Sequence, residues 1–149
     1  MGEEPVDSDM SDDCIFCQII EGEIPSYTVY EDETTYAFLD VNPLSRGHTL
    51  VIPREHHERV NDMSADEAGD AFGVISDLAP AVEAAVDAPA STIAVNNGED
   101  AGQEVPHVHW HIIPQFADSD SRPIHVLFDG ADLDDDEMAA IAEGVRDNQ

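Results

Sequence analysis

Basic side chains are scarce in this sequence, which has no lysine and only five arginines in 149 residues. Asp and Glu together number 34, which gives a net charge of −29 and an isoelectric point near 4.1. Proteins that bind nucleic acid neutralise phosphates with Lys and Arg, so we expect no nucleic-acid partner. The chain also lacks a run of about 18 apolar residues, so we expect no membrane span. The first 13 residues lack the basic and apolar regions of a signal peptide, and we therefore expect a cytoplasmic protein.

The acidic residues are spread along the chain, and the apolar pattern needed for a core persists among them. One interpretation is an acidic interaction protein. We favour adaptation to molar salt, in which the Debye length falls to about 3 Å and repulsion between carboxylates is screened. The absence of lysine agrees with this halophilic interpretation, which concerns the habitat of the protein more than its function.

Cysteine and aromatic residues are also few, yet hydrophobic residues make up 42% of the chain. That fraction is enough for a folded core, and the length suits one domain. We expect residues 1–13 to form an acidic disordered tail. Residues 14–149 should form the domain, with a C-terminal helical extension from about residue 134.

Short runs rich in β-branched and apolar residues, separated by turn-forming residues, predict several strands. These strands are expected at residues 28–30, 35–39, 48–52, 91–96, 107–113 and, less regularly, 124–128. The segment between the fourth and fifth strands, residues 97–105, is expected to be a loop because it contains two glycines and several acidic residues.

Two helices are expected as well. Ser64 and Glu67 have the spacing of a capping box, and apolar residues then recur at helical intervals, which predicts a long helix. Pro80 should kink or split it. Asp134 can cap a second helix that runs to about Arg146. Together these elements predict an α+β domain with a mainly antiparallel sheet, one long helix and a C-terminal helix.

The run His107-Val108-His109-Trp110-His111 is the most informative segment. Alternate side chains of a strand point to the same face, so a strand here would align three imidazoles about 6.6 Å apart. Val108 and Trp110 would then point into the core. A histidine-rich surface strand without function is the alternative, but clustered histidines are uncommon.

Two kinds of site use such a row of imidazoles. Three histidines can hold a catalytic zinc ion, which would make the protein a zinc-dependent hydrolase with ligands His107, His109 and His111. Alternatively, one imidazole is a nucleophile, and its neighbours orient it and donate to the substrate. An imidazole with a pKa of about 6.5 is largely neutral at neutral pH and keeps one lone pair free.

A polar loop rich in glycine, residues 97–103, precedes the row, and its glycines would let backbone N–H groups approach an anion. Together, residues 96–114 (NNGEDAGQEVPHVHWHIIP) resemble the signature of the histidine-triad (HIT) family, in its Hint-like hydrolase branch. The likeness covers about residues 14–128 and includes residues 14–17 (CIFC), 23–25 (EIP), 37–40 (AFLD) and 47–53 (GHTLVIP).

The resemblance implies the HIT fold and covalent catalysis. In the family the middle histidine forms a nucleotidyl intermediate that water hydrolyses, and this role falls on His109. His111 and Gln103 correspond to groups that contact the phosphate or the leaving group. His48 corresponds to an orienting histidine behind the triad, although a core histidine is an equal alternative. Loop N–H groups would add donors, and no metal is required at the reacting phosphorus.

The resemblance also implies a nucleotide site. Asp40 falls at the ribose position, and Asn96 and Gly102 lie near the phosphate position. The apolar wall of the nucleobase pocket corresponds to Phe16, Ile19 and Val41, for which simple core packing is an equal alternative.

The sequence departs from the family pattern at two positions. Glu104 stands where Hint-like members often carry a serine that helps to protonate the leaving group. Gln115 follows Pro114 where many relatives place an arginine. Both departures concern the preferred leaving group more than the chemistry.

Cys14 and Cys17 have the Cys-x-x-Cys spacing of zinc sites and redox motifs. No thioredoxin-like unit surrounds them, so a redox role is not expected, and two buried thiols without function are the simplest alternative. Some HIT relatives are thought to complete a structural zinc site with two histidines. Those would be His56 or His57, together with His107, which would anchor the segment that carries His109.

The resulting hypothesis is a HIT enzyme that binds a purine nucleotide and, as the resemblance implies, forms a homodimer. It would cleave a nucleoside monophosphate from a phosphoramidate or a dinucleoside polyphosphate, and the sequence does not choose between these. Besides the zinc-dependent hydrolase, the alternative is a nucleotide-binding regulatory protein.

Overall fold

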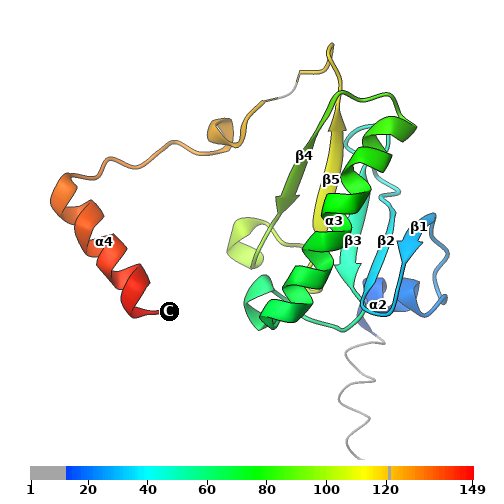
Figure 1. The fold of residues 1–149 in the computed structure, drawn as a ribbon, viewed down its shortest axis with the longest axis horizontal. Coiled ribbons are helices and arrows are strands. Elements are labelled where there is room, and N and C mark those ends of the chain that lie inside the picture. The colour runs from blue at the N-terminus through cyan, green and yellow to red at the C-terminus, as the bar shows by residue number, and fades with distance from the viewer. Residues whose placement is uncertain (1–12, 121) are drawn as a thin grey trace, which may run out of the picture. The chain divides into compact units, whose positions relative to one another are not determined.

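The computed structural model describes residues 13–120 and 122–149, so the predicted acidic tail lies outside this range except for Asp13. The chain divides into two compact units, one ending at Ser119 and the other beginning at Asp120. Among the described residues, the first unit contains the sheet and the helices α2 (Ile15–Ile20) and α3 (Ala65–Ala85), and the second contains the C-terminal helix α4 (Asp135–Asp147) (Figure 1). Within the described part of the chain, no helix is long and apolar enough to span a bilayer.

Five strands form one antiparallel sheet in the order β1-β2-β3-β5-β4. They are β1 (Thr28–Glu31), β2 (Thr35–Leu39), β3 (Thr49–Pro53), β4 (Ala90–Val95) and β5 (Trp110–Gln115) (Figure 1). The α+β class and the antiparallel sheet are thus as predicted, and β3 lies at the centre.

The two faces of the sheet carry separate apolar clusters, because alternate residues of a strand point to opposite sides. The cluster beneath the long helix α3 (Ala65–Ala85) includes the strand residues Ala37, Val51, Trp110 and Ile112. The cluster beside the short helix α2 (Ile15–Ile20) includes the strand residues Tyr36, Phe38, Leu50 and Ile52. His111 pairs with Leu50 across β3 and β5, so it belongs to the α2 face.

Helix α3 begins where the capping box predicts. The Ser64 hydroxyl accepts from the Glu67 N–H, and the Glu67 carboxylate accepts from the Ser64 N–H. The expectation that Pro80 splits this helix is wrong, because the helix continues to Ala85. Pro80 lies on the exposed side of the helix, so water can hydrate the carbonyl group that its missing N–H leaves without a partner.

Two local predictions need correction, and a helix forms where none was predicted. Residues 15–20 form a helix, and the thiol of Cys14 caps it by accepting from the Cys17 N–H at 3.3 Å. Residues 124–127 form a 3-10 helix instead of a strand. The fifth strand begins at Trp110, because the N–H of His107 turns back to the Val105 carbonyl and the N–H of Val108 donates to His57. Only the last of the three triad histidines therefore lies in a strand.

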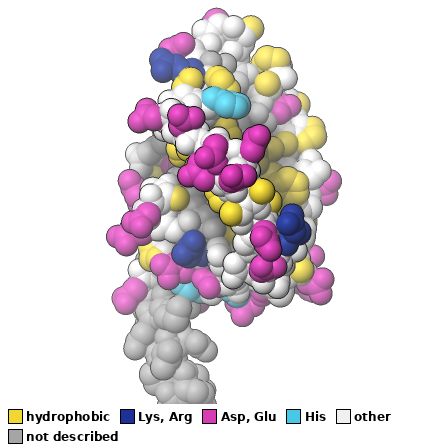
Figure 2. Space-filling model, turned by 90° about the vertical axis from the view of Figure 1, so that its left-hand side faces the viewer, with side chains coloured by type: hydrophobic (Ala, Val, Ile, Leu, Met, Phe, Trp, Pro, Cys, Tyr) yellow, Lys and Arg dark blue, Asp and Glu magenta, His cyan; other side chains and the backbone are white. Residues whose placement is uncertain are grey.

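Acidic side chains are distributed over the surface, as the face in Figure 2 shows. Arg54 pairs with Glu31 at 2.8 Å, and Arg122 pairs with Asp120 at 3.2 Å. With 34 acidic residues and five arginines, most carboxylates must be balanced by ions from the solvent.

Candidate active site

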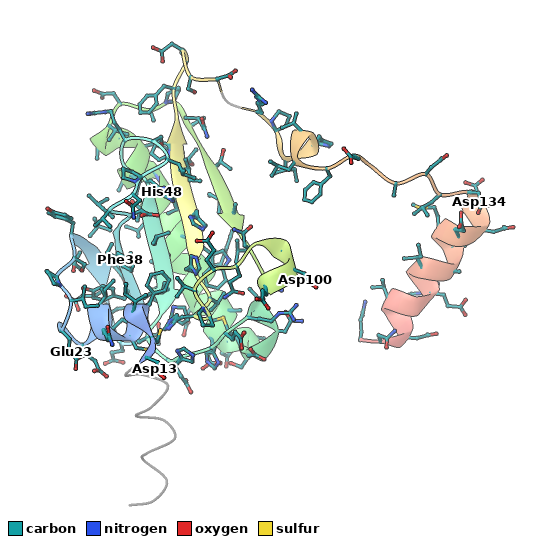
Figure 3. The ribbon with its side chains drawn as sticks, turned by 180° about the vertical axis from the view of Figure 1, so that it is seen from behind. Asp13, Glu23, Phe38, His48, Asp100 and Asp134 are labelled. Carbon is teal, nitrogen blue, oxygen red and sulfur yellow. The ribbon has the colours of Figure 1, made fainter. Side chains whose placement is uncertain are left out.

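A cleft of about 460 Å³ lies on the α2 face of the sheet, a volume in the range of small-molecule sites. Its apolar lining includes Ile15, Phe16 and Ile19 of α2, together with Phe38 and Leu50 of the sheet. Phe38 is labelled on β2 in Figure 3. Its polar lining includes Asp40, Asn96, Glu104, His109 and His111. The cleft therefore combines an apolar wall with a small number of polar groups.

The protonation of His109 is set by the main chain. Its Nδ1 atom lies 2.8 Å from the carbonyl oxygen of His107, which can only accept a hydrogen bond. Nδ1 must therefore carry the hydrogen, and Nε2 keeps its lone pair. The ring is 9% exposed and packs against Phe16 edge to face, with ring centroids 5.0 Å apart. A fixed tautomer and a fixed ring plane are what a nucleophilic imidazole needs.

His48 fixes the second imidazole of the cleft. The N–H of Leu44 donates to Nδ1 of the buried His48 at 3.0 Å, so the hydrogen of His48 is on Nε2. This Nε2 donates to Nδ1 of His111 at 2.9 Å. The hydrogen of His111 is then on Nε2, which is the ring nitrogen free to donate to a ligand in the cleft.

Burial favours the neutral form of His48 and of His111. It lowers the pKa of His111 to about 4, with further contributions from the neighbouring His109 and His48, and Asp40 opposes the shift. Burial also lowers the pKa of His48, again against the opposing effect of Asp40, whose carboxylate lies 3.7 Å from His48 Nε2. The hydrogen-bond directions deduced above for His48 and His111 therefore hold at neutral pH.

The glycine-rich loop is held together by its own hydrogen bonds. The Gln103 carboxamide accepts from the Gly98 N–H at 2.7 Å and donates to the carbonyls of Glu58 and Val105 at 2.6 and 2.9 Å. The N–H groups of residues 101, 102 and 103 also donate within the loop. Gly98 and Gly102 have φ angles of 107° and 99°, which favour glycine. These donors are thus occupied, contrary to the expectation that they surround a phosphate.

Cys14 and Cys17 lie beside His56 and His107. Nδ1 of His107 is 3.3 Å from the Cys14 sulfur and 3.6 Å from the Cys17 sulfur, and Nδ1 of His56 is 3.4 Å from the Cys17 sulfur. The four ligand atoms all lie within 4.8 Å of one another. In a tetrahedral zinc site, sulfur and nitrogen ligands are about 3.5 Å apart, so this donor set fits zinc.

The tautomer of His107 also suits a metal. Its Nε2 donates to the Pro53 carbonyl at 2.9 Å, so the lone pair of Nδ1 faces the thiols. His57 points elsewhere, with Nε2 3.1 Å from the Glu67 carboxylate. Among the described residues, the three triad histidines form no common metal-binding group, because His107 faces the cysteines.

The model of the HIT domain family matches residues 21–118, which is more than half of the chain. The chain belongs to the HIT family.

Several HIT proteins are similar to it. An uncharacterized HIT-like protein of Methanocaldococcus jannaschii is 50% identical over 69% of this chain and 79% of that protein. Adenosine 5'-monophosphoramidase of Saccharomyces cerevisiae is 41% identical over 68% of this chain and 62% of the yeast protein. A crystal structure from Streptococcus mutans matches with a TM-score of 0.81 and 40% identity, covering 91% of this chain and 85% of the other.

Most residues that the HIT resemblance selected do come together in the fold. The cleft is lined by Phe16, Ile19, Asp40, Val41, Asn96, Gly102, His109 and His111. His48 lies behind His111, and Gln103 supports the loop without lining the cleft.

Sequence reasoning missed the backbone groups of this HIT site. The Leu44 N–H and the carbonyls of Pro53 and His107 set three imidazole tautomers, and no side-chain pattern marks them. It also left His56 and His57 as equal candidates for the cysteine site. The capping box that ends at Glu67 was visible in the sequence, but not that its carboxylate also reaches His57.

Proposed function

We propose that this HIT protein hydrolyses a purine nucleoside phosphoramidate, or transfers its nucleoside monophosphate, through a covalent intermediate on His109. The observation that carries this proposal is the hydrogen bond from His109 Nδ1 to the His107 carbonyl, which leaves Nε2 unprotonated in a residue that lines the cleft. The activity named for the yeast relative, adenosine 5'-monophosphoramidase, supports the substrate class.

The reaction takes two displacements. The Nε2 lone pair of His109 forms a bond to phosphorus as the P–N bond breaks, and the leaving nitrogen takes the electron pair and a proton from the solvent. Water then attacks phosphorus, the bond to Nε2 breaks, and the nucleoside monophosphate leaves while the water proton passes to the solvent. Splitting one displacement into two lowers the barrier of each.

Residues around the nucleophile would hold the nucleotide. His111 Nε2–H and the Asn96 amide are the donors we assign to the phosphate, and the Asp40 carboxylate accepts from a ribose hydroxyl. The apolar residues assigned to the base are Phe16, Ile19 and Val41. Positioned donors of this kind supply most of the acceleration in phosphoryl-type transfer.

We also propose a structural zinc ion bound by Cys14, Cys17, His56 and His107. Four protein ligands would close the coordination shell, so the ion would stabilise the fold and take no direct part in catalysis. It would act on the site by fixing His107, whose carbonyl orients His109.

Intact-mass spectrometry after mixing with adenosine 5'-phosphoramidate tests the proposed reaction. The wild type should carry one adenylyl group, and His109→Ala should carry none, whereas the exposed His125→Ala should behave as the wild type. An adduct that persists in His109→Ala would refute the assignment. Loss of activity on chelation while the protein stays folded would instead favour the zinc-dependent hydrolase.

A further inference from the structure

Among the described residues that line it, the cleft contains acidic side chains and no arginine. Its charged side chains, among the described residues that line it, are the carboxylates of Asp40 and Glu104. None of the five arginines lines it, and the chain has no lysine. Gln115, at the position where the family often has arginine, bonds to Thr92 and is not part of the lining.

Glu104 extends from a fixed piece of backbone. The preceding residue, Gln103, is buried, and its side chain forms hydrogen bonds to the backbone of Gly98 and of Val105, which lie on either side of Glu104 in the chain. Glu104 itself is exposed and lines the same cleft as His109. The carboxylate of Glu104 therefore belongs to the cleft that also contains His109.

The position of this charge relates it to the leaving group. The residues assigned to the base come from α2 and from the segment after β2, and Asp40 of that segment is assigned to the ribose. The loop that carries Asn96, Gly102 and Glu104 supplies another part of the lining of the same cleft. Because the base and the ribose are assigned to other elements, we assign to Glu104 the part of the cleft that receives the group attached to phosphorus opposite the nucleoside.

We infer that Glu104 selects phosphoramidates whose leaving amine carries a second, positively charged ammonium group. This inference rests on the proposed function and narrows its substrate class. A dinucleoside polyphosphate would instead bring extra phosphates against two carboxylates with no cationic side chain to balance them. Like charges in a partly desolvated cleft repel, and opposite charges attract, so both effects favour the cationic amine.

Three adenosine 5'-phosphoramidates with leaving amines of equal length test this inference. The amines are 1-aminobutane, which is neutral at its far end, 1,4-diaminobutane, which is cationic there, and 4-aminobutanoate, which is anionic. For the wild type, kcat/KM should fall in the order cationic, neutral, anionic. Glu104→Gln should reduce the ratio of cationic to anionic substrate by about three- to tenfold, as expected for one partly screened charge.

Glu99→Gln is the matched control, because Glu99 is an exposed glutamate of the same loop that does not line the cleft. It removes the same charge from the chain and should leave the ratio unchanged. The charge at the far end of the amine also changes how readily the amine leaves, in the wild type and in the variant alike. The decisive quantity is therefore the difference between the wild type and Glu104→Gln in the ratio of kcat/KM for the cationic and anionic substrates. Raising the KCl concentration should shrink the wild-type ratio toward that of Glu104→Gln.

Calorimetric binding of the same three compounds to His109→Ala separates this inference from the proposed function. If the wild type forms an adduct but neither kcat/KM nor binding follows charge, the inference is overturned and the proposed function stands. If no compound forms an adduct but binding still follows charge through Glu104, the proposed function fails and the charge preference stands. Faster cleavage of diadenosine polyphosphates than of all three amidates would also overturn the inference.

Discussion

Nε2 of His48 lies 2.9 Å from Nδ1 of His111, and His48 is itself fixed by the Leu44 N–H on its other nitrogen. This order of donors determines which nitrogen of His111 can donate to a phosphate. His48 does not line the cleft, and we propose that it acts through its neighbour as a positioning residue.

Replacing His48 tests that role. In His48→Ala the hydrogen of His111 is free to move to Nδ1, so we expect kcat to fall by roughly 10- to 100-fold, as for other residues that orient a functional histidine, with a smaller change in KM. His48→Gln can still accept and donate, so it should retain more activity. Steady-state kinetics after a circular dichroism check measure this, and an unchanged kcat in folded His48→Ala would contradict it.

The lowered pKa of His111 gives the stability a defined pH dependence. Below about pH 6.5 this histidine takes up a proton in the unfolded chain, whereas in the folded protein it stays neutral until about pH 4. The unfolded state thus binds more protons in this window, so the contribution of His111 is full above about pH 6.5 and is lost as the pH falls toward 4. Burial of His48 acts in the same direction.

Chemical denaturation of the wild type and of His111→Asn, at constant salt and at several pH values between 4 and 7, tests this dependence. Comparing the two proteins separates the contribution of His111 to the unfolding free energy from that of the many carboxylates, which both share. The difference in unfolding free energy between the two proteins should change across the window, with the wild type losing more stability toward pH 4. Parallel curves would show that burial of His111 has no such effect.

His56 and His57 form a matched pair for the proposed zinc site. Elemental analysis should find one zinc per wild-type chain, little in His56→Ala and a full equivalent in His57→Ala, because His57 faces Glu67. A ligand present at a thousandfold its Kd stabilises by about 4 kcal/mol. Chelation should therefore lower the Tm by roughly 10 °C for a domain of this size. Zinc retained in His56→Ala, or absent from the wild type, would refute the site.

The two edges of the sheet differ, which makes the proposed homodimer testable. Strand β4 pairs with β5 in unbroken register over six residues, and its Ile93 is 42% exposed. Strand β1 has an irregular register, and its Val29 is 43% exposed. A strand with a regular backbone at the edge of a sheet can pair with a strand of another chain, whereas an irregular edge strand disfavours such pairing. We therefore expect β4 to form the dimer contact. By light scattering, Ile93→Lys should be monomeric and Val29→Lys dimeric, and the reverse would place the interface at β1.

The proposed halophilic character predicts a rise of Tm with salt. Raising KCl from about 0.1 M to 1 M shortens the Debye length from about 10 to 3 Å and screens repulsion between the surface carboxylates. Thermal unfolding followed by circular dichroism at several KCl concentrations measures this. Equal stability in dilute buffer and in molar salt would contradict the interpretation.

The sequence predicted well what side-chain periodicity determines. Val108, Trp110 and Ile112 alternate with the triad, and all three are buried beneath α3 as the pattern required. It failed where the backbone has local partners. The alternating pattern predicts a strand from residue 107, but the strand begins only at Trp110, after Pro106 and the turn in which the His107 N–H bonds to the Val105 carbonyl.

The candidate site was predictable to the same extent. Eight of the cleft-lining residues were found through the HIT resemblance, whereas the role of Gln103 was not. The sequence places a polar side chain in a glycine-rich loop but does not show whether it faces a ligand or the loop itself. Here the carbonyls of Glu58 and Val105 accept from the Gln103 amide nitrogen, and its oxygen accepts from the Gly98 N–H, so the side chain faces the loop and its neighbour.

The carbonyl group that orients His109 belongs to the main chain, and no side-chain replacement can delete it. A replacement of the His107 side chain that keeps the path of the backbone therefore leaves the orientation of His109, the proposed nucleophile, unchanged. Directed evolution could accordingly alter the cysteine-lined site and keep the proposed reacting imidazole, as long as the new site holds the backbone of residue 107 in place.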